Sequence, residues 1–249
     1  MTPDDPVHDP APGPLVSGAD NFRDVGGLRA GAHRTRTGVL FRSGNLARLD
    51  DGGRQALAEL GIRRIIDLRA DEEVHRSPSL VAGLDLETQR VPLFLGSVAS
   101  LFEEDLTLGQ MYARIVEDSS AGVVEVVRGI IADQPVIVHC TVGKDRTGVT
   151  VALALAAAGV DDEAVVADYA RTEALLPEER NRQVSDLLRS MHPDAVNVID
   201  LATRSPAHVM RELLADLTAR YGSVGDYLLA HGLTSHELEK LRAVLIAQD

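Results

Sequence analysis

The only cysteine of the 249-residue chain, Cys140, lies six positions before Arg146 in the run His-Cys-Thr-Val-Gly-Lys-Asp-Arg-Thr-Gly. A thiolate is a good nucleophile, and a guanidinium can bind two oxygens of a phosphate group through its planar fork. A cysteine and an arginine at the two ends of a short glycine-bearing loop could therefore attack and hold a phosphate monoester.

The segments on either side of this loop must position it. Residues 135–139 form a short apolar run rich in β-branched residues, which predicts a buried strand, and residues 147–159 predict an apolar helix that ends at Gly159. A loop between a strand and a helix N-terminus presents unpaired amides and the positive end of the helix dipole. We expect this field to lower the pKa of the thiol and to bind a phosphate through one continuous stretch, namely Thr141, Val142, Gly143, Lys144, Asp145 and Arg146.

Alternative roles for the loop suit its residues less well. A lone cysteine is usually a small buried apolar residue, but that role needs no glycine, lysine and arginine at these spacings. A nucleotide-binding loop would have Ser or Thr after its Gly-Lys pair, where this chain has Asp145. One cysteine without a compact His/Cys cluster disfavours zinc, so we expect no metal and no cofactor. Sulfur transfer also uses a loop cysteine, but it would not need the Gly143–Thr147 run.

The loop with its Cys-x5-Arg-Thr pattern resembles the protein tyrosine and dual-specificity phosphatase superfamily. Its Gly-Lys-Asp-Arg-Thr form is similar to the bacterial branch typified by the mycobacterial protein tyrosine phosphatase B. Further stretches carry the same resemblance, namely 21–27 (Asn-Phe-Arg-Asp-Val-Gly-Gly), 40–43 (Leu-Phe-Arg-Ser), 67–69 (Asp-Leu-Arg) and parts of 221–228. The resemblance implies an α/β fold and hydrolysis of phosphotyrosine, and in several members also of phosphoserine, phosphothreonine or phosphoinositides.

Three aspartates are candidates for the general acid that protonates the leaving group. Asp67 follows a predicted strand at the carboxyl edge of the sheet, where sites of open α/β sheets lie. Asp145 lies within the loop itself, and Asp24 belongs to the first motif of the resemblance. Asp67 could equally pair with Lys144 or Arg69, so the choice between Asp67 and Asp145 stays open.

Several further residues are expected to support the site. His139 should shape the surroundings of the cysteine, and Thr147 can donate its hydroxyl to the sulfur when the thiophosphate is hydrolysed. Arg42 and Arg69, like Arg23, stand within motifs of the resemblance, so we expect them to form a locally positive pocket. Lys144 could contact a second phosphate of the substrate or pair with a nearby carboxylate.

Periodicity and turn residues predict strands that alternate with helices, followed by a helix-rich C-terminal half. This order indicates an α/β fold with a central, mostly parallel or mixed sheet flanked by helices. The first 18 residues contain five prolines and three aspartates and predict a disordered or extended tail (1–18), followed by a single domain (19–249). The expected strands are near 38–42, 63–68, 88–93 and 135–139, and the expected helices near 51–60, 108–118, 121–133, 147–159, 161–174, 178–191, 194–202, 206–221, 224–231 and 235–247.

Composition limits the partners. A net charge of −13 disfavours nucleic acid, which needs a basic surface. No apolar run approaches the length of a membrane span, and the N-terminus lacks the basic and apolar segments of a signal peptide. We therefore expect a cytoplasmic protein, although export without a standard signal peptide would leave the same sequence.

Together these features predict a metal-independent protein tyrosine phosphatase, with dual specificity as an option, that acts through a phosphocysteine on Cys140. A phosphatase of phosphoinositides, sugar phosphates or nucleotide monophosphates would use the same chemistry. A phosphate-binding module without turnover is the third option, and the intact Cys140, Arg146 and Thr147 disfavour it. The sequence does not predict an oligomeric state.

Overall fold

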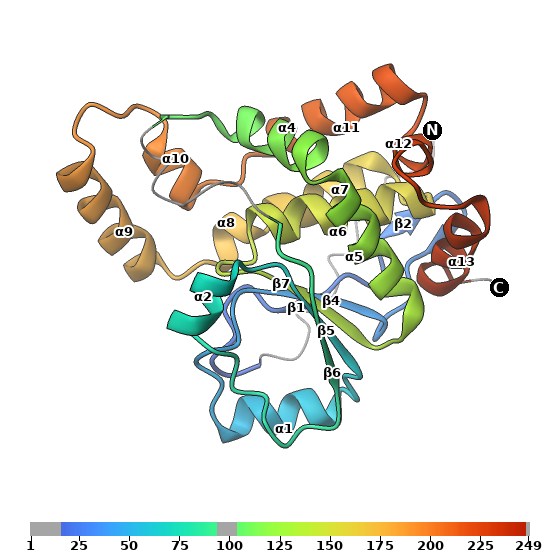
Figure 1. The fold of residues 1–249 in the computed structure, drawn as a ribbon, viewed down its shortest axis with the longest axis horizontal. Coiled ribbons are helices and arrows are strands. Elements are labelled where there is room, and N and C mark those ends of the chain that lie inside the picture. The colour runs from blue at the N-terminus through green and yellow to red at the C-terminus, as the bar shows by residue number, and fades with distance from the viewer. Residues whose placement is uncertain (1–15, 94–103, 248–249) are drawn as a thin grey trace, which may run out of the picture.

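A mixed sheet with helices on both faces forms the centre of the computed structural model, which describes residues 16–93 and 104–247 (Figure 1). Within these residues the sheet has five strands in the order β1-β4-β7-β5-β6, and only β1 runs antiparallel to its neighbour. The predicted mostly parallel α/β sheet is confirmed. The strands are β1 (Arg23–Asp24), β4 (Leu40–Ser43), β5 (Arg64–Asp67), β6 (Glu87–Arg90) and β7 (Val136–His139), and a separate hairpin pairs β2 (Arg29–Ala30) with β3 (His33–Arg34).

Alternation along the central strands fills two apolar layers. Ile137 of β7 packs into the layer that contains Leu57 of helix α1, whereas Val136 and Val138 face the larger core on the other side. Successive side chains of a strand point to opposite faces, so a strand buried on both faces must be apolar at every position. This explains the unbroken apolar run that predicted β7.

The helices follow the predicted order and make the C-terminal half helix-rich. Helix α6 is buried on nearly every side because it packs against α4, α5, α7, α12 and α13, which accounts for its uniformly apolar sequence. The helices are α1 (Asp51–Glu59), α2 (Asp71–Arg76), α4 (Leu108–Asp118), α5 (Ser120–Ala132), α6 (Asp145–Ala158), α7 (Asp162–Ala170), α8 (Thr172–Leu175), α9 (Glu178–Met191), α10 (Val198–Thr203), α11 (Ala207–Tyr221), α12 (Val224–Ala230) and α13 (Ser235–Leu245).

Most expected elements are present, with shifted ends. The helix expected over 161–174 is divided at Arg171, where the Ala174 amide donates to the Arg171 carbonyl three residues back and tightens the turn. The helix expected from 194 begins at Val198, because the Asp105 carboxylate accepts from the amides of residues 196 and 197 and holds that segment outside the helix. Helix α2 and the strands β1, β2 and β3 were not predicted.

The N-terminal residues allow a partial comparison with the predicted division into a tail and a domain. Residues 1–15 lie outside the described residues, so the expected tail over 1–18 can be compared only at its last positions. There Val16 is buried with Phe41 and Leu46 in the layer beneath the sheet. The division at 18/19 stays a prediction.

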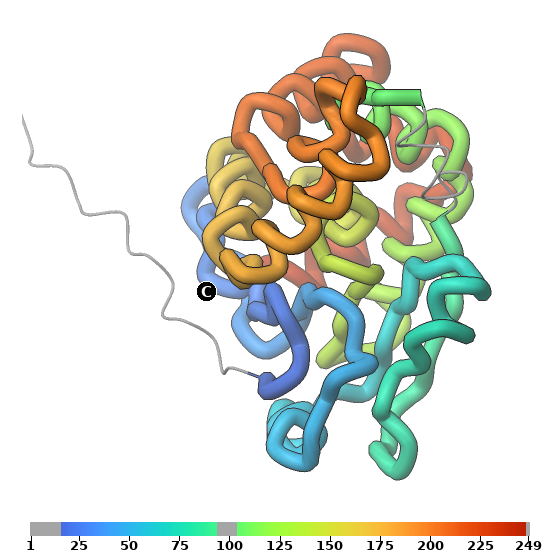
Figure 2. The backbone as a smooth tube through the Cα atoms, turned by 90° about the vertical axis from the view of Figure 1, so that its left-hand side faces the viewer, coloured from blue at the N-terminus to red at the C-terminus, as the bar shows by residue number. Residues whose placement is uncertain are grey.

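The helical half extends away from the sheet. Figure 1 shows the segment carrying α9 and α10, coloured orange, at the upper left, and α1, coloured cyan, at the bottom, and Figure 2 shows the same segment well above α1. Within the described residues, no helix combines the length and the apolar character that crossing a membrane requires.

Candidate active site

The carboxyl ends of the parallel strands lie in register and define one edge of the sheet. Ser43 of β4 pairs with His139 of β7, and His139 pairs with Asp67 of β5. Cys140 follows His139 directly, so the loop that carries it starts at this edge, as expected for a site in an open α/β sheet.

The loop closes around the cysteine sulfur. The amide of Gly143 donates to Sγ of Cys140 at 3.3 Å, and the cysteine is 3% exposed. Gly143 has φ +75°, and a Cβ there would lie 2.4 Å from the Ser43 carbonyl oxygen. Only glycine combines that conformation with such a close approach to β4. The loop therefore packs against the sheet edge with an amide directed at the sulfur.

Two side chains from the N-terminal motifs hold the back of the loop. The carbonyl of Gly143 accepts from Asn21 Nδ2 at 2.9 Å and from Arg42 Nη2 at 3.0 Å. Because a trans peptide points its C=O and N–H in opposite directions, fixing this carbonyl fixes the amide of Lys144 on the other side. Asn21 and Arg42 thus orient the loop from outside.

Arg42 and Arg23 share a buried carboxylate. Asp168 of α7 accepts from Arg23 Nε and Arg42 Nη1, both at 2.8 Å. Burial opposes the charge of Asp168, but the two arginines outweigh it and lower its pKa to about 2. Burial and the neighbouring Arg42 lower the pKa of Arg23 to about 10. Asp168 offsets one of the two guanidinium charges, and the locally positive pocket expected from these arginines stays a prediction.

Arg146 is held by a residue that the sequence did not single out. Glu73 of α2 accepts from Nη1 of Arg146 at 2.7 Å and from Nη2 at 2.8 Å. The hydroxyl of Thr141 also donates to Glu73. Burial opposes the charge of Glu73, but the hydrogen bonds and charge of Arg146 lower its pKa to about 2. An ionised carboxylate therefore connects the two ends of the loop.

Glu73 leaves one edge of the guanidinium outside this contact. The carboxylate meets the Nη1–Nη2 end of Arg146, whereas the second bidentate edge consists of Nε and Nη2. That edge is free of hydrogen bonds to described residues except for a 3.4 Å contact of Nη2 with Thr141. Two oxygens of a phosphoryl group can bind there.

Asp67 is engaged by Arg69 through both of its oxygens. Arg69 Nε donates to Oδ1 at 2.9 Å and Nη2 donates to Oδ2 at 2.8 Å, and Asp67 is buried. Burial acts to raise the pKa of Asp67, but Arg69 and the neighbouring His139 outweigh it, so the pKa is lowered. The pair joins residues within one motif, and Asp67 is held as a carboxylate.

Asp145 has a different environment at the start of α6. Its Oδ1 accepts from Lys144 Nζ at 2.6 Å and from the Tyr112 hydroxyl at 2.8 Å. Lys144 is 1% exposed, and its Nζ also donates to the Arg204 carbonyl at 2.9 Å. Of the two possibilities for Lys144, the structure shows the ion pair. Asp145 remains partly exposed beside the loop.

Of the remaining expected residues, His139 and Thr147 lie beside the cysteine loop and Asp24 does not. Burial lowers the pKa of His139 to about 4, so its ring is neutral at pH 7, and Nδ1 lies 3.2 Å from the Cys140 carbonyl oxygen. The hydroxyl of Thr147 is buried and has no hydrogen-bond partner among the described residues. Asp24 accepts from the amides of Gly26 and Gly38 in the turns after β1 and before β4, and is not part of the site.

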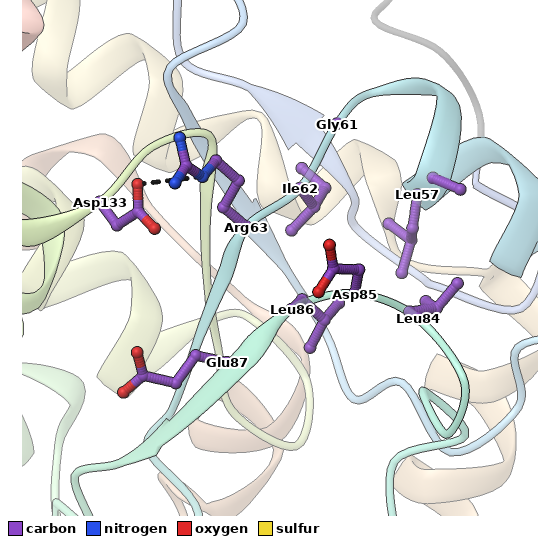
Figure 3. Close-up of a pocket in the computed structure, with 10 residues that line it drawn as sticks. Leu57, Gly61, Ile62, Arg63, Leu84, Asp85, Leu86, Glu87 and Asp133 are labelled. Carbon is purple, nitrogen blue, oxygen red and sulfur yellow. Dashed lines mark ion pairs between the residues drawn. The ribbon is translucent and has the colours of Figure 1, made fainter.

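Two cavities lie in the described part of the molecule near the sheet. A groove of about 460 Å³ runs beside Thr141 and Val142 and is lined further by Arg48, Leu176 and Arg180. A larger cavity of about 780 Å³ lies at the amino ends of β5 and β6, where Arg63 pairs with Asp133 (Figure 3). Of these two cavities in the described residues, the groove is the one that adjoins the cysteine loop.

A thiol at the centre of a strand–loop–helix anion cradle, on the carboxyl edge of a parallel sheet, defines the class of cysteine-based phosphatases. The chain belongs to the tyrosine phosphatase family, whose model matches residues 14–247. It is 32% identical to the triple specificity protein phosphatase PtpB of Mycobacterium tuberculosis, over 93% of this chain and 98% of PtpB.

Two further proteins are similar to this chain. A tyrosine-protein phosphatase of Nostoc commune is 32% identical over 83% of this chain and 74% of its own length. Among solved structures, TpbA of P. aeruginosa aligns with a TM-score of 0.41 and 18% identity, over 78% of this chain and 98% of TpbA.

Sequence reasoning missed Asn21, Glu73, Tyr112 and Asp168 as contributors to the site. One signal could have pointed to Glu73. It follows the carboxyl end of β5 by six residues, within an acidic first helical turn, and therefore had to lie near the site edge. The sequence alone could not distinguish it from Glu72.

Proposed function

We propose that this chain hydrolyses phosphate monoesters, phosphotyrosine in proteins first among them, through a phosphocysteine intermediate on Cys140. The observation that carries the proposal is the arrangement of the loop. The sulfur accepts from the Gly143 amide at 3.3 Å, and Arg146 is fixed at the other end with one bidentate edge free for phosphoryl oxygens. These are the two functions that the chemistry needs, a stabilised thiolate and a fixed cation.

The reaction proceeds in two steps. The Cys140 thiolate attacks phosphorus while the bond from phosphorus to the leaving oxygen breaks, and that oxygen takes a proton from a carboxylic acid. Water then attacks the phosphocysteine, the same carboxylate accepts the proton of the water, and the S–P bond breaks to release inorganic phosphate and the thiolate. Arg146 and the loop amides of residues 141–146 neutralise charge on the phosphoryl oxygens in both steps.

We assign the acid role to Asp145 rather than Asp67. Both oxygens of Asp67 are bound by Arg69 at 2.9 and 2.8 Å in a buried pair, which keeps that group ionised and occupied. Asp145 belongs to the loop, is partly exposed, and receives hydrogen bonds on Oδ1 only from the described residues. The proposed role of Asp67 is to hold Arg69 and the end of β5 in place.

Residues around the sulfur have supporting roles in this proposal. The Thr147 hydroxyl, buried and without a partner among the described residues, is available to donate to the sulfur as it leaves phosphorus. Neutral His139 and the buried Arg42 shape the loop without touching the substrate.

The substrate range is proposed to include more than phosphotyrosine. The relative PtpB is named as a triple specificity phosphatase, and the groove beside Thr141 offers about 460 Å³ with Arg48 and Arg180 in its lining. A phosphorylated protein side chain or a small phosphate monoester could place its leaving group there. A cytoplasmic location is proposed because the single cysteine is free, and a reducing compartment keeps it so.

The test is a panel of phosphotyrosine and phosphoserine peptides, a phosphoinositide and a nucleotide monophosphate, assayed with EDTA present. We expect turnover with EDTA and none in Cys140→Ser. Turnover that survives in Cys140→Ser, or that EDTA abolishes, would contradict the mechanism. Asp145→Asn should lose about 10²–10⁴-fold on alkyl phosphates, the usual contribution of general acid catalysis, whereas Asp67→Asn should mainly lower stability.

A further inference from the structure

A pair of buried tyrosines stands behind Asp145. The hydroxyl of Tyr112, on α4, donates to Oδ1 of Asp145 at 2.8 Å, and the hydroxyls of Tyr112 and Tyr169 lie 2.7 Å apart. Their rings meet edge to face, with centroids 6.0 Å apart and an interplanar angle of 88°. The two tyrosines come from separate helices, so the packing of α4 and α7 against α6 brings this chain of hydroxyls to the loop.

The direction of the hydrogen bonds follows from counting protons. Tyr112 has one hydroxyl proton, and it donates this proton in the hydrogen bond to Oδ1 of Asp145. The 2.7 Å contact between the hydroxyls is then satisfied only if Tyr169 donates to Tyr112. Burial first, and the charge of Asp145 second, raise the pKa of both phenols above the usual value for tyrosine. Both phenols therefore keep their protons at neutral pH and act as donors.

These contacts distinguish the two oxygens of Asp145. Oδ1 accepts from the Tyr112 hydroxyl and also from the ammonium of Lys144 at 2.6 Å. Lys144 has no acceptor atom, and the Tyr112 oxygen already accepts from Tyr169, so both groups act as donors to Oδ1. Within the described residues, no hydrogen bond reaches Oδ2. An acidic proton on Oδ1 would have to displace one of two buried donors, whereas a proton on Oδ2 displaces none.

We propose that Tyr112, supported by Tyr169, is a positioning residue that fixes Oδ1 of Asp145, so that Oδ2 carries the proton to the leaving oxygen. The proposal rests on the assignment of Asp145 as the general acid. Tyr112 touches neither substrate nor phosphorus. It acts by holding the carboxyl plane in one orientation from the side away from the reaction.

This role predicts an effect that depends on the leaving group. A phenolate that is already a good leaving group departs without a proton, so its rate does not depend on where Oδ2 points. An alkoxide or an unsubstituted phenolate needs the proton in the transition state. A misplacement of about 1 Å in such a group can cost about 100-fold.

The experiment compares 2,4-dinitrophenyl phosphate with phenyl phosphate in the full chain and in Tyr112→Phe. We compare kcat/KM, which reports formation of the phosphocysteine and not its hydrolysis, and expect it to fall about 10- to 100-fold on phenyl phosphate, with a change of less than about twofold on the dinitrophenyl ester. Tyr169→Phe keeps the Tyr112–Asp145 contact but removes the donor to Tyr112, and should show the same selectivity to a smaller extent. It also serves as the second variant if Tyr112→Phe does not fold.

Tyr227→Phe is the matched control, because the buried Tyr227 hydroxyl donates to the Val116 carbonyl at 2.7 Å, away from the loop. It should lower stability and leave the ratio of the two rates unchanged. Asp145→Asn is the reference for loss of the acid. If Asp145→Asn changes the ratio and neither tyrosine variant does, the positioning role is overturned while the proposed function stands. If Asp145→Asn leaves the ratio unchanged, the acid assignment itself fails.

Discussion

The carboxylate of Glu73 binds Arg146 end-on, with Oε2 2.7 Å from Nη1 and Oε1 2.8 Å from Nη2. Glu73 lies on α2, which follows β5, and Arg146 lies in the first turn of α6, which follows β7. The contact therefore joins the two helices that begin at neighbouring strand ends. It fixes the plane of the guanidinium before any substrate binds. A fixed plane matters because a transition state with charge on its equatorial oxygens requires a donor already aimed at them.

We expect Glu73→Gln to lower kcat about tenfold, while the Kd for inorganic phosphate changes less than about threefold. Two effects of this change on phosphate affinity oppose each other. Removal of the negative charge of Glu73 strengthens phosphate binding, whereas release of the Arg146 guanidinium weakens it. The second effect is expected to be larger in the transition state, because stabilising its equatorial oxygens requires a guanidinium already aimed at them. Steady-state kinetics and phosphate titration separate them. Glu72→Gln is the control, because Glu72 lies on the same helix and pairs with the exposed Arg76. Equal kcat in the two variants would refute a positioning role for Glu73.

The sequence predicted the part of the site that is continuous along the chain. Cys140 to Arg146 lie between a strand and a helix whose apolar patterns are local, so their juxtaposition follows from chain connectivity alone. Family resemblance marked Asn21 to Gly27 and the Asp67-Leu68-Arg69 stretch without saying what each residue contacts. The structure shows that Arg42 supports the loop and that Arg69 binds Asp67.

The partners that complete the site lie far away in sequence. Glu73 is 73 residues from Arg146, Tyr112 is 33 residues from Asp145, and Asp168 is 126 residues from Arg42. No periodicity in one chain encodes such pairs, because they depend on how helices pack across the sheet. The two-residue strands β1, β2 and β3 were missed for another reason, since two residues cannot display an alternation.

The buried Asp168 should be the main electrostatic contribution to stability near the loop. We expect Asp168→Asn to lower the free energy of unfolding by about 3–5 kcal/mol, because it leaves the buried Arg23 and Arg42 without a counter-charge. Urea denaturation measures the difference. Asp162→Asn, an exposed change on the same helix, should cost less than about 0.5 kcal/mol. If Asp168→Asn lowers the free energy of unfolding no more than Asp162→Asn does, Arg23 and Arg42 do not depend on Asp168 as their counter-charge.

The lowered pKa of Asp168 leads to a prediction of how acid destabilises the fold. The pKa of Asp168 is about 2 in the folded chain and near 3.8 when unfolded, so its contribution is complete above pH 3.8 and is lost as pH falls toward 2. Asp168→Asn should therefore show a smaller loss of stability than wild type over that interval. Parallel curves for the two proteins between pH 4 and 2 would contradict the lowered pKa.

Burial of His139 should make the free energy of unfolding depend on pH at milder acidity as well. Its pKa is about 4 in the folded chain, against 6.5 in the unfolded chain, because burial disfavours the charged ring. The unfolded state thus takes up the proton first, and stability falls as pH drops from 6.5 to 4. Between pH 7 and 5 the loss is about 2 kcal/mol. Urea denaturation at both pH values should show this loss in wild type and not in His139→Gln, whereas the exposed His236→Gln should retain it.

The last prediction concerns the one loop position where conformation and space both require glycine. Gly143 has φ +75°, and a Cβ there would lie 2.4 Å from the Ser43 carbonyl oxygen and 2.6 Å from the Gly44 nitrogen. Backbone atoms of β4 cannot move aside as a side chain can, so Gly143→Ala must displace the loop from the sheet edge. The Gly143 amide would then leave the Cys140 sulfur, and the carbonyl would lose Asn21 and Arg42.

Gly38→Ala separates the two causes, because Gly38 has φ +72° but no atom of the described residues lies within 4 Å of where its Cβ would be. It carries the backbone strain, about 1–2 kcal/mol, without the clash. We expect Gly38→Ala to keep wild-type turnover with reduced stability, and Gly143→Ala to lose more than about 100-fold in kcat/KM. Alkylation of Cys140 by iodoacetate at one fixed pH provides an independent measurement. In Gly143→Ala the rate should change, since the sulfur has lost the amide that donates to it, and an unchanged rate would show that the loop does not depend on this glycine.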